Sequence, residues 1–254
     1  MPPSDRDEEG SAVQTELDRT FGSQEVDPEE RERRIRHVFE VVAARYDLMN
    51  DFMSFGIHRL WKRRLVRDAA AAAGQVIVDL AGGTGDVARQ MASADRTVLI
   101  VDPSLPMMSV GRQRGLPDVT CVAGSGERIP LADGSVDTVT IAFGIRNMTR
   151  MAAALEEMHR ILRPGGWMHC LEFSKPWAPI RPFYNLYSSL VIPRLGALVA
   201  RQPSAYHYLV ESIRRFPDQE EMKALMEAAG FRDVRYRNLS MGIACIHSGA
   251  KGAG

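Results

Sequence analysis

Short apolar runs rich in β-branched residues alternate with amphipathic stretches through the middle of the chain. Runs of this kind predict buried strands, and the amphipathic stretches predict helices. The expected strands span residues 76–80, 97–101, 119–123, 136–142 and 167–173. The expected helices between them span residues 86–94, 104–114 and 150–162. Strands that alternate with helices indicate an α/β fold with a doubly wound, mostly parallel sheet.

The N-terminal region divides into a polar tail and a helical part. Residues 1–26 contain few large apolar side chains, so this tail is expected to be disordered. The segment 27–30, Asp-Pro-Glu-Glu, provides an N-cap, a proline at the first helical position and a capping-box glutamate. These features predict a helix to about Arg45, and a second helix is expected at about 58–73.

The last third of the chain becomes helical again for three segments. Within it, residues 180–216 are expected to form a helical insertion that covers a substrate. Two final strands, at about 231–238 and 242–248, predict an antiparallel hairpin that completes a seven-stranded sheet. We therefore expect one domain over residues 27–254, with residues 27–74 as its N-terminal helical cap.

One stretch restricts the range of possible functions more than any other part of the chain. It is 76–86, Val-Ile-Val-Asp-Leu-Ala-Gly-Gly-Thr-Gly-Asp. A β-branched run leads into Gly82, Gly83 and Gly85, and glycine lets a ligand approach the backbone closely. A strand, a tight glycine turn and a helix start form the place where open α/β sheets bind nucleotide-like cofactors. Asp79 precedes the glycines, as in enzymes that bind S-adenosylmethionine.

A dinucleotide site is the alternative that this loop leaves open. Gly83-Thr84-Gly85 followed by Ala88 fits the pattern G-x-G-x-x-A, and Asp102 lies 19 residues beyond Gly83. An acid at that distance, at the end of the second strand, would bind a ribose in either class of enzyme. Asp102 could also cap the helix that follows it.

Later turns favour S-adenosylmethionine over a dinucleotide. Ser125 and Gly126 follow the third strand, where an adenine would lie. The acidic turn at 133–137 is common in methyltransferases and has no fixed place in dinucleotide folds, and the helix stop at 162–166 supports the same choice. A dinucleotide oxidoreductase would also need a second catalytic domain, for which the chain has no room.

Composition and charge restrict the partners. The formal net charge is zero, which gives no support to a nucleic acid partner. Cys121, Cys170 and Cys245 are widely separated, so we expect buried free thiols rather than a disulfide framework or a metal site. No signal peptide opens the chain and no run approaches the roughly 20 apolar residues of a membrane span, so a soluble cytoplasmic protein is expected.

Four sequence blocks resemble one known family. The block 46–62, Tyr-Asp-Leu-Met-Asn-Asp-Phe-Met-Ser-Phe-Gly-Ile-His-Arg-Leu-Trp-Lys, is similar to the first signature of the ubiquinone/menaquinone biosynthesis C-methyltransferases. The blocks 142–147 (Ala-Phe-Gly-Ile-Arg-Asn), 171–176 (Leu-Glu-Phe-Ser-Lys-Pro) and 208–219 resemble further blocks of that family. The similarity spans residues 38–251, and the first block is far more specific than the glycine loop.

The resemblance implies a class I methyltransferase that methylates a ring carbon of a polyprenylated benzoquinol or naphthoquinol. It implies S-adenosylmethionine as the cofactor, contacted by Thr84, Asp102, Ser125 and Gly126. The ring carbon becomes nucleophilic when a hydroxyl loses its proton, so the reduced quinol is the expected substrate. A methyltransferase acting on another small ring acceptor, and a non-catalytic cofactor-binding subunit of a quinone-synthesis complex, are the alternatives.

Three residues are candidates for the chemistry. Arg146, at the end of the fourth strand, is expected to stabilise the phenolate of the acceptor, although it could instead pair with an acid and fix the loop. Asn147 could orient the ring oxygen or a water. His58 is either a base, since imidazole titrates near neutrality, or a capping and packing residue. Tyr46 is expected to shape the cofactor lid.

The segment 183–199 places Leu190 and Leu195 at helical spacing, interrupted by Pro193 and Arg194. It predicts an amphipathic helix that covers the sheet, or alternatively a wall for the polyprenyl tail or an interfacial contact. Because a polyprenylated substrate resides in the membrane, we expect peripheral contact at its inner face. The sequence is compatible with a homo-oligomer or a quinone-synthesis complex, and it does not distinguish ubiquinone from menaquinone precursors.

Overall fold

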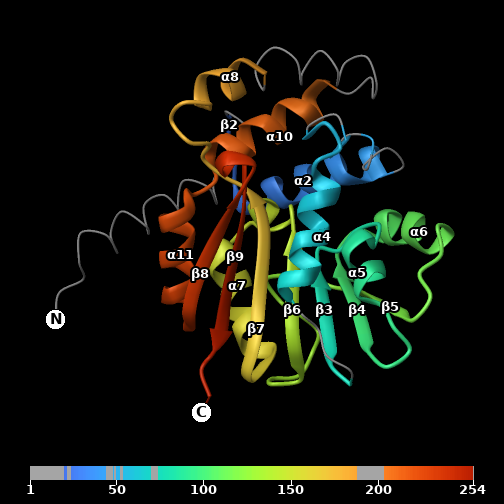
Figure 1. Cartoon of the computed structure of the whole chain (residues 1–254). Helices are drawn as coiled ribbons and strands as arrows, with labels where there is room; N and C mark the ends of the chain where they lie inside the picture. Colours follow the sequence, from blue (N-terminus) through green and yellow to red (C-terminus); the bar gives the residue numbers. More distant parts are fainter. Residues whose placement is uncertain are drawn as a thin grey trace.

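A seven-stranded sheet forms the centre of the computed structural model. The described residues are 20–21, 24–43, 48, 50–51, 54–69, 74–187 and 203–253. The strands of the sheet are β3 (Val76–Leu80), β4 (Thr97–Asp102), β5 (Val119–Ala123), β6 (Val136–Ala142), β7 (Leu162–Phe173), β8 (Phe231–Leu239) and β9 (Ala244–Lys251). They lie in the order β5-β4-β3-β6-β7-β9-β8 (Figure 1), which confirms the predicted strands and the closing hairpin.

The strands that follow β3 in the chain are placed first on one side of it (β4, β5) and then on the other (β6, β7). This strand is parallel to β4 on one side and to β6 on the other. The carboxyl end of β3 is therefore the topological switch point, where open α/β sheets bind their ligands. β9 runs antiparallel to both β7 and β8, so the last hairpin closes the sheet on the side away from β5.

Helices cover both faces of the sheet, as the alternating pattern predicted. The described helices are α2 (Pro28–Val42), α4 (His58–Ala69), α5 (Asp86–Met91), α6 (Leu105–Gln113), α7 (Met151–Ile161), α8 (Arg181–Leu186), α10 (Pro203–Arg215) and α11 (Gln219–Ala228). Neighbouring residues of β3 point to opposite faces. Ile77 packs in one core with Leu65 of α4, and Val78 packs in the other with Leu155 of α7.

Helices α2, α8 and α10 lie above the carboxyl ends of the strands (Figure 1). Asp27 is the N-cap of α2, because its Oδ1 accepts from the Glu30 N–H at 2.8 Å. This confirms the predicted helix start. The Glu30 carboxylate accepts from Arg34 Nε at 2.6 Å rather than completing the predicted capping box.

Part of the N-terminal segment that was expected to be disordered is ordered. Thr20–Phe21 (β1) pairs antiparallel with Gln24–Glu25 (β2). The Phe21 ring stacks on Tyr208 of α10, with ring centroids 4.6 Å apart. A single aromatic anchor whose partner is distant in the sequence produces no periodic pattern, which is why the sequence did not predict this strand pair.

The turn predicted at 162–166 is an irregularity inside β7. Leu162 pairs with Val136 and Trp167 pairs with Thr138, so the residues between Leu162 and Trp167 stand opposite a single residue of β6. Gly165 has φ +81°, a left-handed conformation that glycine adopts without strain. The helix stop is therefore where it was predicted, but strand pairing exists on both sides of it.

Two further expectations concern thiols and membrane helices. All three cysteines are free; Cys170 and Cys245 are buried as expected, whereas Cys121 is partly exposed. No helix within the described ranges is long and apolar enough to cross a membrane. The segment 188–202, which contains Leu190 and Leu195, lies outside the described residues.

Candidate active site

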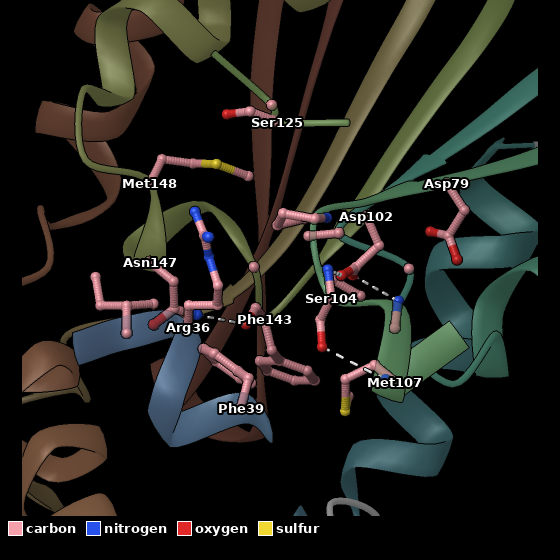
Figure 2. Close-up of a pocket in the computed structure, with 18 of the residues that line it drawn as sticks. Arg36, Phe39, Asp79, Asp102, Ser104, Met107, Ser125, Phe143, Asn147 and Met148 are labelled. Atoms are coloured by element: carbon pink, nitrogen blue, oxygen red, sulfur yellow. Dashed lines mark hydrogen bonds between the residues drawn. The ribbon is translucent and has the colours of Figure 1, made fainter. Parts of the chain in front are cut away.

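A pocket opens at the carboxyl ends of β3, β4 and β6, beside the switch point (Figure 2). The predicted site residues that line it are Asp79, Gly82, Gly83, Thr84, Asp102, Ser125, Gly126 and Asn147. Helix α2 covers the pocket with Glu32, Ile35, Arg36 and Phe39. The fold thus brings the glycine loop, the end of β4 and the loops after β5 and β6 together under one helix.

Asp79 lines the pocket and is buried. Its Oδ1 accepts from Thr140 Oγ1 at 2.9 Å, and its Oδ2 accepts from the Ala88 N–H at 3.1 Å. Burial raises the pKa of Asp79 to about 7, against the opposing effect of these hydrogen bonds and of the Lys62 charge. A Cβ at Gly82 would lie 2.8 Å from Asp79 Oδ2, so the loop needs glycine there to pass over the carboxylate.

Asp102 is held by two backbone donors. Its Oδ2 accepts from the Gly83 N–H at 2.9 Å, and its Oδ1 accepts from the Ser104 N–H at 2.7 Å (Figure 2). The N-cap of α6 is Ser104, whose Oγ accepts from the Met107 N–H, so Asp102 is not the cap. Each carboxylate oxygen has further lone pairs, so Asp102 can accept ribose hydroxyls in the pocket.

Gly85 differs from the other predicted glycines because it does not line the pocket. It is the N-cap of α5 with φ +80°, and a Cβ there would lie 2.7 Å from Leu116 Cδ2. The close packing of the loop against Leu116 therefore explains this glycine. Thr84, between Gly83 and Gly85, is buried and does line the pocket.

The loop after β5 contributes Ser125, Gly126 and Glu127 to the lining of the pocket. Ser125 Oγ accepts from the Glu127 N–H at 3.2 Å. A Cβ at Gly126 would lie 2.7 Å from the Cε of Met148, so the Met148 side chain packs directly over this glycine. Glu127 Oε1 accepts from the Thr149 N–H at 2.6 Å and so joins these two loops.

The loop after β6 has a strained start. Phe143 has φ +57°, a conformation that costs energy for a non-glycine residue and is frequent at functional sites. Its carbonyl accepts from Arg146 Nη1 at 2.9 Å and from Asn147 Nδ2 at 3.3 Å. Asn147 Oδ1 accepts from Tyr208 Oη at 3.0 Å, and burial raises the pKa of Tyr208 to about 12, which keeps it a neutral donor. The Asn147 amide is therefore fixed where it faces the pocket.

Arg146 does not line the pocket. Its Nη1 lies 2.5 Å from Glu172 Oε1 in an ion pair whose side chains are 2% and 1% exposed. The guanidinium also lies over the Phe173 ring, 5.6 Å from its centroid. This is the arrangement of the alternative interpretation, in which Arg146 pairs with an acid and fixes the loop. A direct role in stabilising the phenolate stays a prediction.

His58 is buried at the start of α4 and also does not line the pocket. Its Nε2 lies 2.8 Å from Asp51 Oδ1, and Arg59 donates to the same carboxylate. Burial lowers the pKa of His58, against the hydrogen bond to Asp51. The geometry favours the packing interpretation over a catalytic base. Tyr46 lies outside the described residues.

Several important residues were not predicted from the sequence. Lys62, Arg36 and Phe39 line the pocket, and Glu172 pairs with Arg146. Lys62 ends the most specific sequence block, and Glu172 is an acid inside an apolar strand, so both carried a usable signal. Nothing in the amphipathic pattern of α2 says what its Arg36 and Phe39 lie against. The described ranges contain no cluster of three His, Cys, Asp or Glu side chains suited to a metal ion.

Two solved methyltransferases share this architecture. A possible histamine N-methyltransferase from Thermotoga maritima superimposes with a TM-score of 0.62, at 21% identity over 85% of this chain and 99% of that chain. A phosphoethanolamine N-methyltransferase from Haemonchus contortus, in complex with S-adenosylhomocysteine, superimposes with a TM-score of 0.57, at 15% identity over 76% of this chain and 52% of its own. These similarities show the fold alone.

Sequence comparison identifies the family. The ubiquinone/menaquinone biosynthesis C-methyltransferase UbiE of Rubrivivax gelatinosus is 65% identical over 94% of this chain and 95% of its own length. UbiE of Caulobacter vibrioides is 45% identical, over 91% of this chain and 96% of its own length. The family model of the ubiE/COQ5 methyltransferases matches residues 28–251. The chain has the fold of class I S-adenosylmethionine-dependent methyltransferases and belongs to the ubiE/COQ5 methyltransferase family.

Proposed function

We propose that this chain transfers the methyl group of S-adenosylmethionine to a ring carbon of a reduced, polyprenylated quinol in ubiquinone and/or menaquinone biosynthesis. The observation that carries the proposal is the pocket at the switch point, where Asp102 is fixed beside Gly83 and faces the same space as Asn147. Membership of the ubiE/COQ5 family, and the naming of its relatives after ubiquinone and menaquinone biosynthesis, support this acceptor class.

The residues of the pocket fit the cofactor. Asp102 would hold the ribose hydroxyls, and Ser125 and Gly126 would lie along the adenine. Gly82 and Gly83 line the pocket, and without side chains they leave the backbone of the loop open to a ligand. When bound, S-adenosylmethionine supplies an electrophilic methyl group on a sulfonium.

The protein's main task is to align an acceptor carbon with that methyl group, which is a proximity effect. Asn147, held by Tyr208 and by the Phe143 carbonyl, would orient a ring oxygen of the acceptor. Arg146 would act on a hydroxyl of the acceptor through its positive charge, from behind this loop. A cation close to a hydroxyl favours its ionised form, and ionisation makes the ring carbon nucleophilic.

We extend the proposal to peripheral contact with the membrane that holds a polyprenylated acceptor. Exposed apolar side chains occur where the start of α4, helix α8 and η4 (Ser240–Gly242) come together, namely Phe55, Leu60, Trp177, Leu186 and Met241. The Phe55 and Tyr187 rings are 4.8 Å apart, and the Trp177 N–H donates to the Met241 carbonyl at 3.0 Å. An apolar surface of this kind supports interfacial binding.

Vesicle sedimentation tests the membrane contact. Leu60→Glu combined with Trp177→Glu should reduce sedimentation with anionic lipid vesicles, because both changes put a charge on the apolar surface. Thr97→Glu, at an exposed position at the amino end of β4, is the control and should sediment like the parent chain. Equal sedimentation of the parent and the double variant would contradict the contact.

Methyl transfer tests the activity. Labelled S-adenosylmethionine is offered with reduced demethylmenaquinol and, in parallel, with a reduced methoxy-polyprenyl-benzoquinol. Turnover on either acceptor supports the proposal and assigns the pathway. Intact cofactor binding without turnover on either would favour another ring acceptor or a non-catalytic subunit.

A further inference from the structure

One lysine in the pocket is buried and only partly satisfied. Lys62 of α4 is 5% exposed and lines the pocket together with the glycine loop. Its Nζ donates to Asp86 Oδ2 at 2.9 Å, the one hydrogen-bond partner that the described part of the chain gives it. An ammonium group has three N–H donors, so two remain for a ligand. Lysines are rarely buried to this degree unless they are paired, and Asp86 is the pairing partner of Lys62.

Asp86 provides the opposite charge at the same place. It is the first residue of α5, it lines the pocket, and its second oxygen lies 3.5 Å from Arg89 Nη2. Burial raises its pKa, but the Lys62 charge and hydrogen bond outweigh burial and hold the pKa below its usual value. The wall of the pocket near the glycine loop therefore carries one ammonium and one carboxylate side by side.

The sheet order sets which part of the cofactor reaches this pair. Ser125 follows β5, Asp102 ends β4, and the glycine loop follows β3, so these groups succeed one another across the sheet. A nucleoside held at Asp102 and Ser125 directs the rest of the cofactor toward the glycine loop, which Lys62 and Asp86 flank.

The other cation of the pocket is placed differently. Arg36 of α2 has a side chain that is 52% exposed and pairs with Glu32 at 2.6 Å. Figure 2 shows it on the side of Asn147 and Met148, away from Asp79. Arg36 is thus remote from the glycine loop, and Lys62 is the cation that lies beside it.

We propose that Lys62 binds the α-carboxylate of the methionine end of S-adenosylmethionine, and that Asp86 receives its α-ammonium group. The free end of an α-amino acid carries one negative and one positive charge, which the pair matches with charge-assisted hydrogen bonds. This inference rests on the proposed cofactor. It assigns to the pair the recognition of the amino-acid end, separately from Asp102, which contacts the nucleoside.

Two probes separate the contact from a structural role. S-adenosylhomocysteine carries the amino-acid end, and 5′-methylthioadenosine has the same nucleoside without it. Isothermal titration calorimetry of Lys62→Met should show about tenfold or more weaker binding of S-adenosylhomocysteine, because a hydrogen bond between charged groups is lost. Binding of 5′-methylthioadenosine should be unchanged. Lys62→Arg, which keeps the charge, should restore part of the loss.

Arg63→Met is the matched control, because Arg63 is the exposed neighbour on the same helix and should bind both probes like the parent chain. Equal weakening of both probes in Lys62→Met would show a structural role and overturn the assignment, as would unchanged binding of S-adenosylhomocysteine. If the parent chain bound neither probe, the proposed cofactor itself would be contradicted, and the assignment with it.

Discussion

Arg146 and Glu172 form a buried ion pair, with Nη1 and Oε1 2.5 Å apart, that links the loop after β6 to the end of β7. The same Nη1 donates to the carbonyl of Phe143, which also accepts from Asn147. The pair therefore holds the strained residue at the start of the loop and, through it, the amide that faces the pocket. It supports the site mechanically, whatever Arg146 contributes to the charge of the transition state.

Removing one partner of this pair should be more harmful than removing both. Glu172→Leu or Arg146→Leu leaves a buried charge without its partner, which costs about 3–5 kcal/mol of the free energy of unfolding. The double variant removes both charges and should lose less than either single variant. Urea denaturation of the three variants measures this. A loss in the double variant equal to the sum of the single losses would show that the two residues act independently.

Asp102→Asn should weaken both cofactor probes. The ribose is common to S-adenosylhomocysteine and 5′-methylthioadenosine, so loss of the charged acceptor should reduce both affinities by about tenfold or more. This response differs from that of Lys62→Met, which affects one probe. Asp118→Asn, at an exposed acid after α6, is the control. Unchanged calorimetric affinities in Asp102→Asn would remove Asp102 from the cofactor site.

Asp79 should make stability depend on pH. Burial raises its pKa from a usual value near 3.8 to about 7, so the folded state binds the proton more tightly than the unfolded state. The stabilisation is complete below the unfolded pKa and is lost as the pH rises toward the folded pKa. Asp79→Asn cannot ionise, so its free energy of unfolding should fall less between about pH 4 and pH 7 than that of the parent chain. Parallel stability curves for the two chains would argue against a raised pKa.

Arg31 should fasten the helix that covers the pocket. Its Nη1 donates to the Met148 carbonyl at 2.8 Å and its Nη2 to the Arg146 carbonyl at 3.4 Å, so α2 is tied to the loop after β6. Arg31→Met should speed amide hydrogen exchange in α2 and weaken the binding of S-adenosylhomocysteine. Arg33→Met, on the exposed side of the same helix, should do neither. Identical exchange in both variants would mean that α2 is held by its apolar face alone.

Local sequence patterns were sufficient for the sheet and for the pocket residues at the carboxyl ends of β3 and β4. Apolar runs predicted β3 to β7, and the end of β4 at Asp102 followed from one acid after a β-branched run. Asp79 is in β3 and the glycines follow it within six residues, so one continuous stretch of backbone places them together. These residues were predictable because a single short segment of the sequence carries them.

Other parts of the site were less predictable because they depend on contacts between distant segments. Arg146 was expected to stabilise the phenolate of the acceptor, but its side chain pairs with Glu172, 26 residues away on β7. Phe21 is ordered by Tyr208, from the other end of the chain. Lys62 becomes a pocket residue only because α4 packs beside α5. No periodicity within one element encodes these pairings.

The most direct test of the proposed activity offers one polyprenylated benzoquinone to the enzyme in two redox states, with labelled S-adenosylmethionine. We predict that the label appears on a ring carbon of the reduced quinol, located by mass spectrometry, and that the oxidised quinone stays unlabelled, because only the quinol has a hydroxyl that can ionise. Label on an oxygen, or equal labelling of quinol and quinone, would contradict C-methylation through a phenolate.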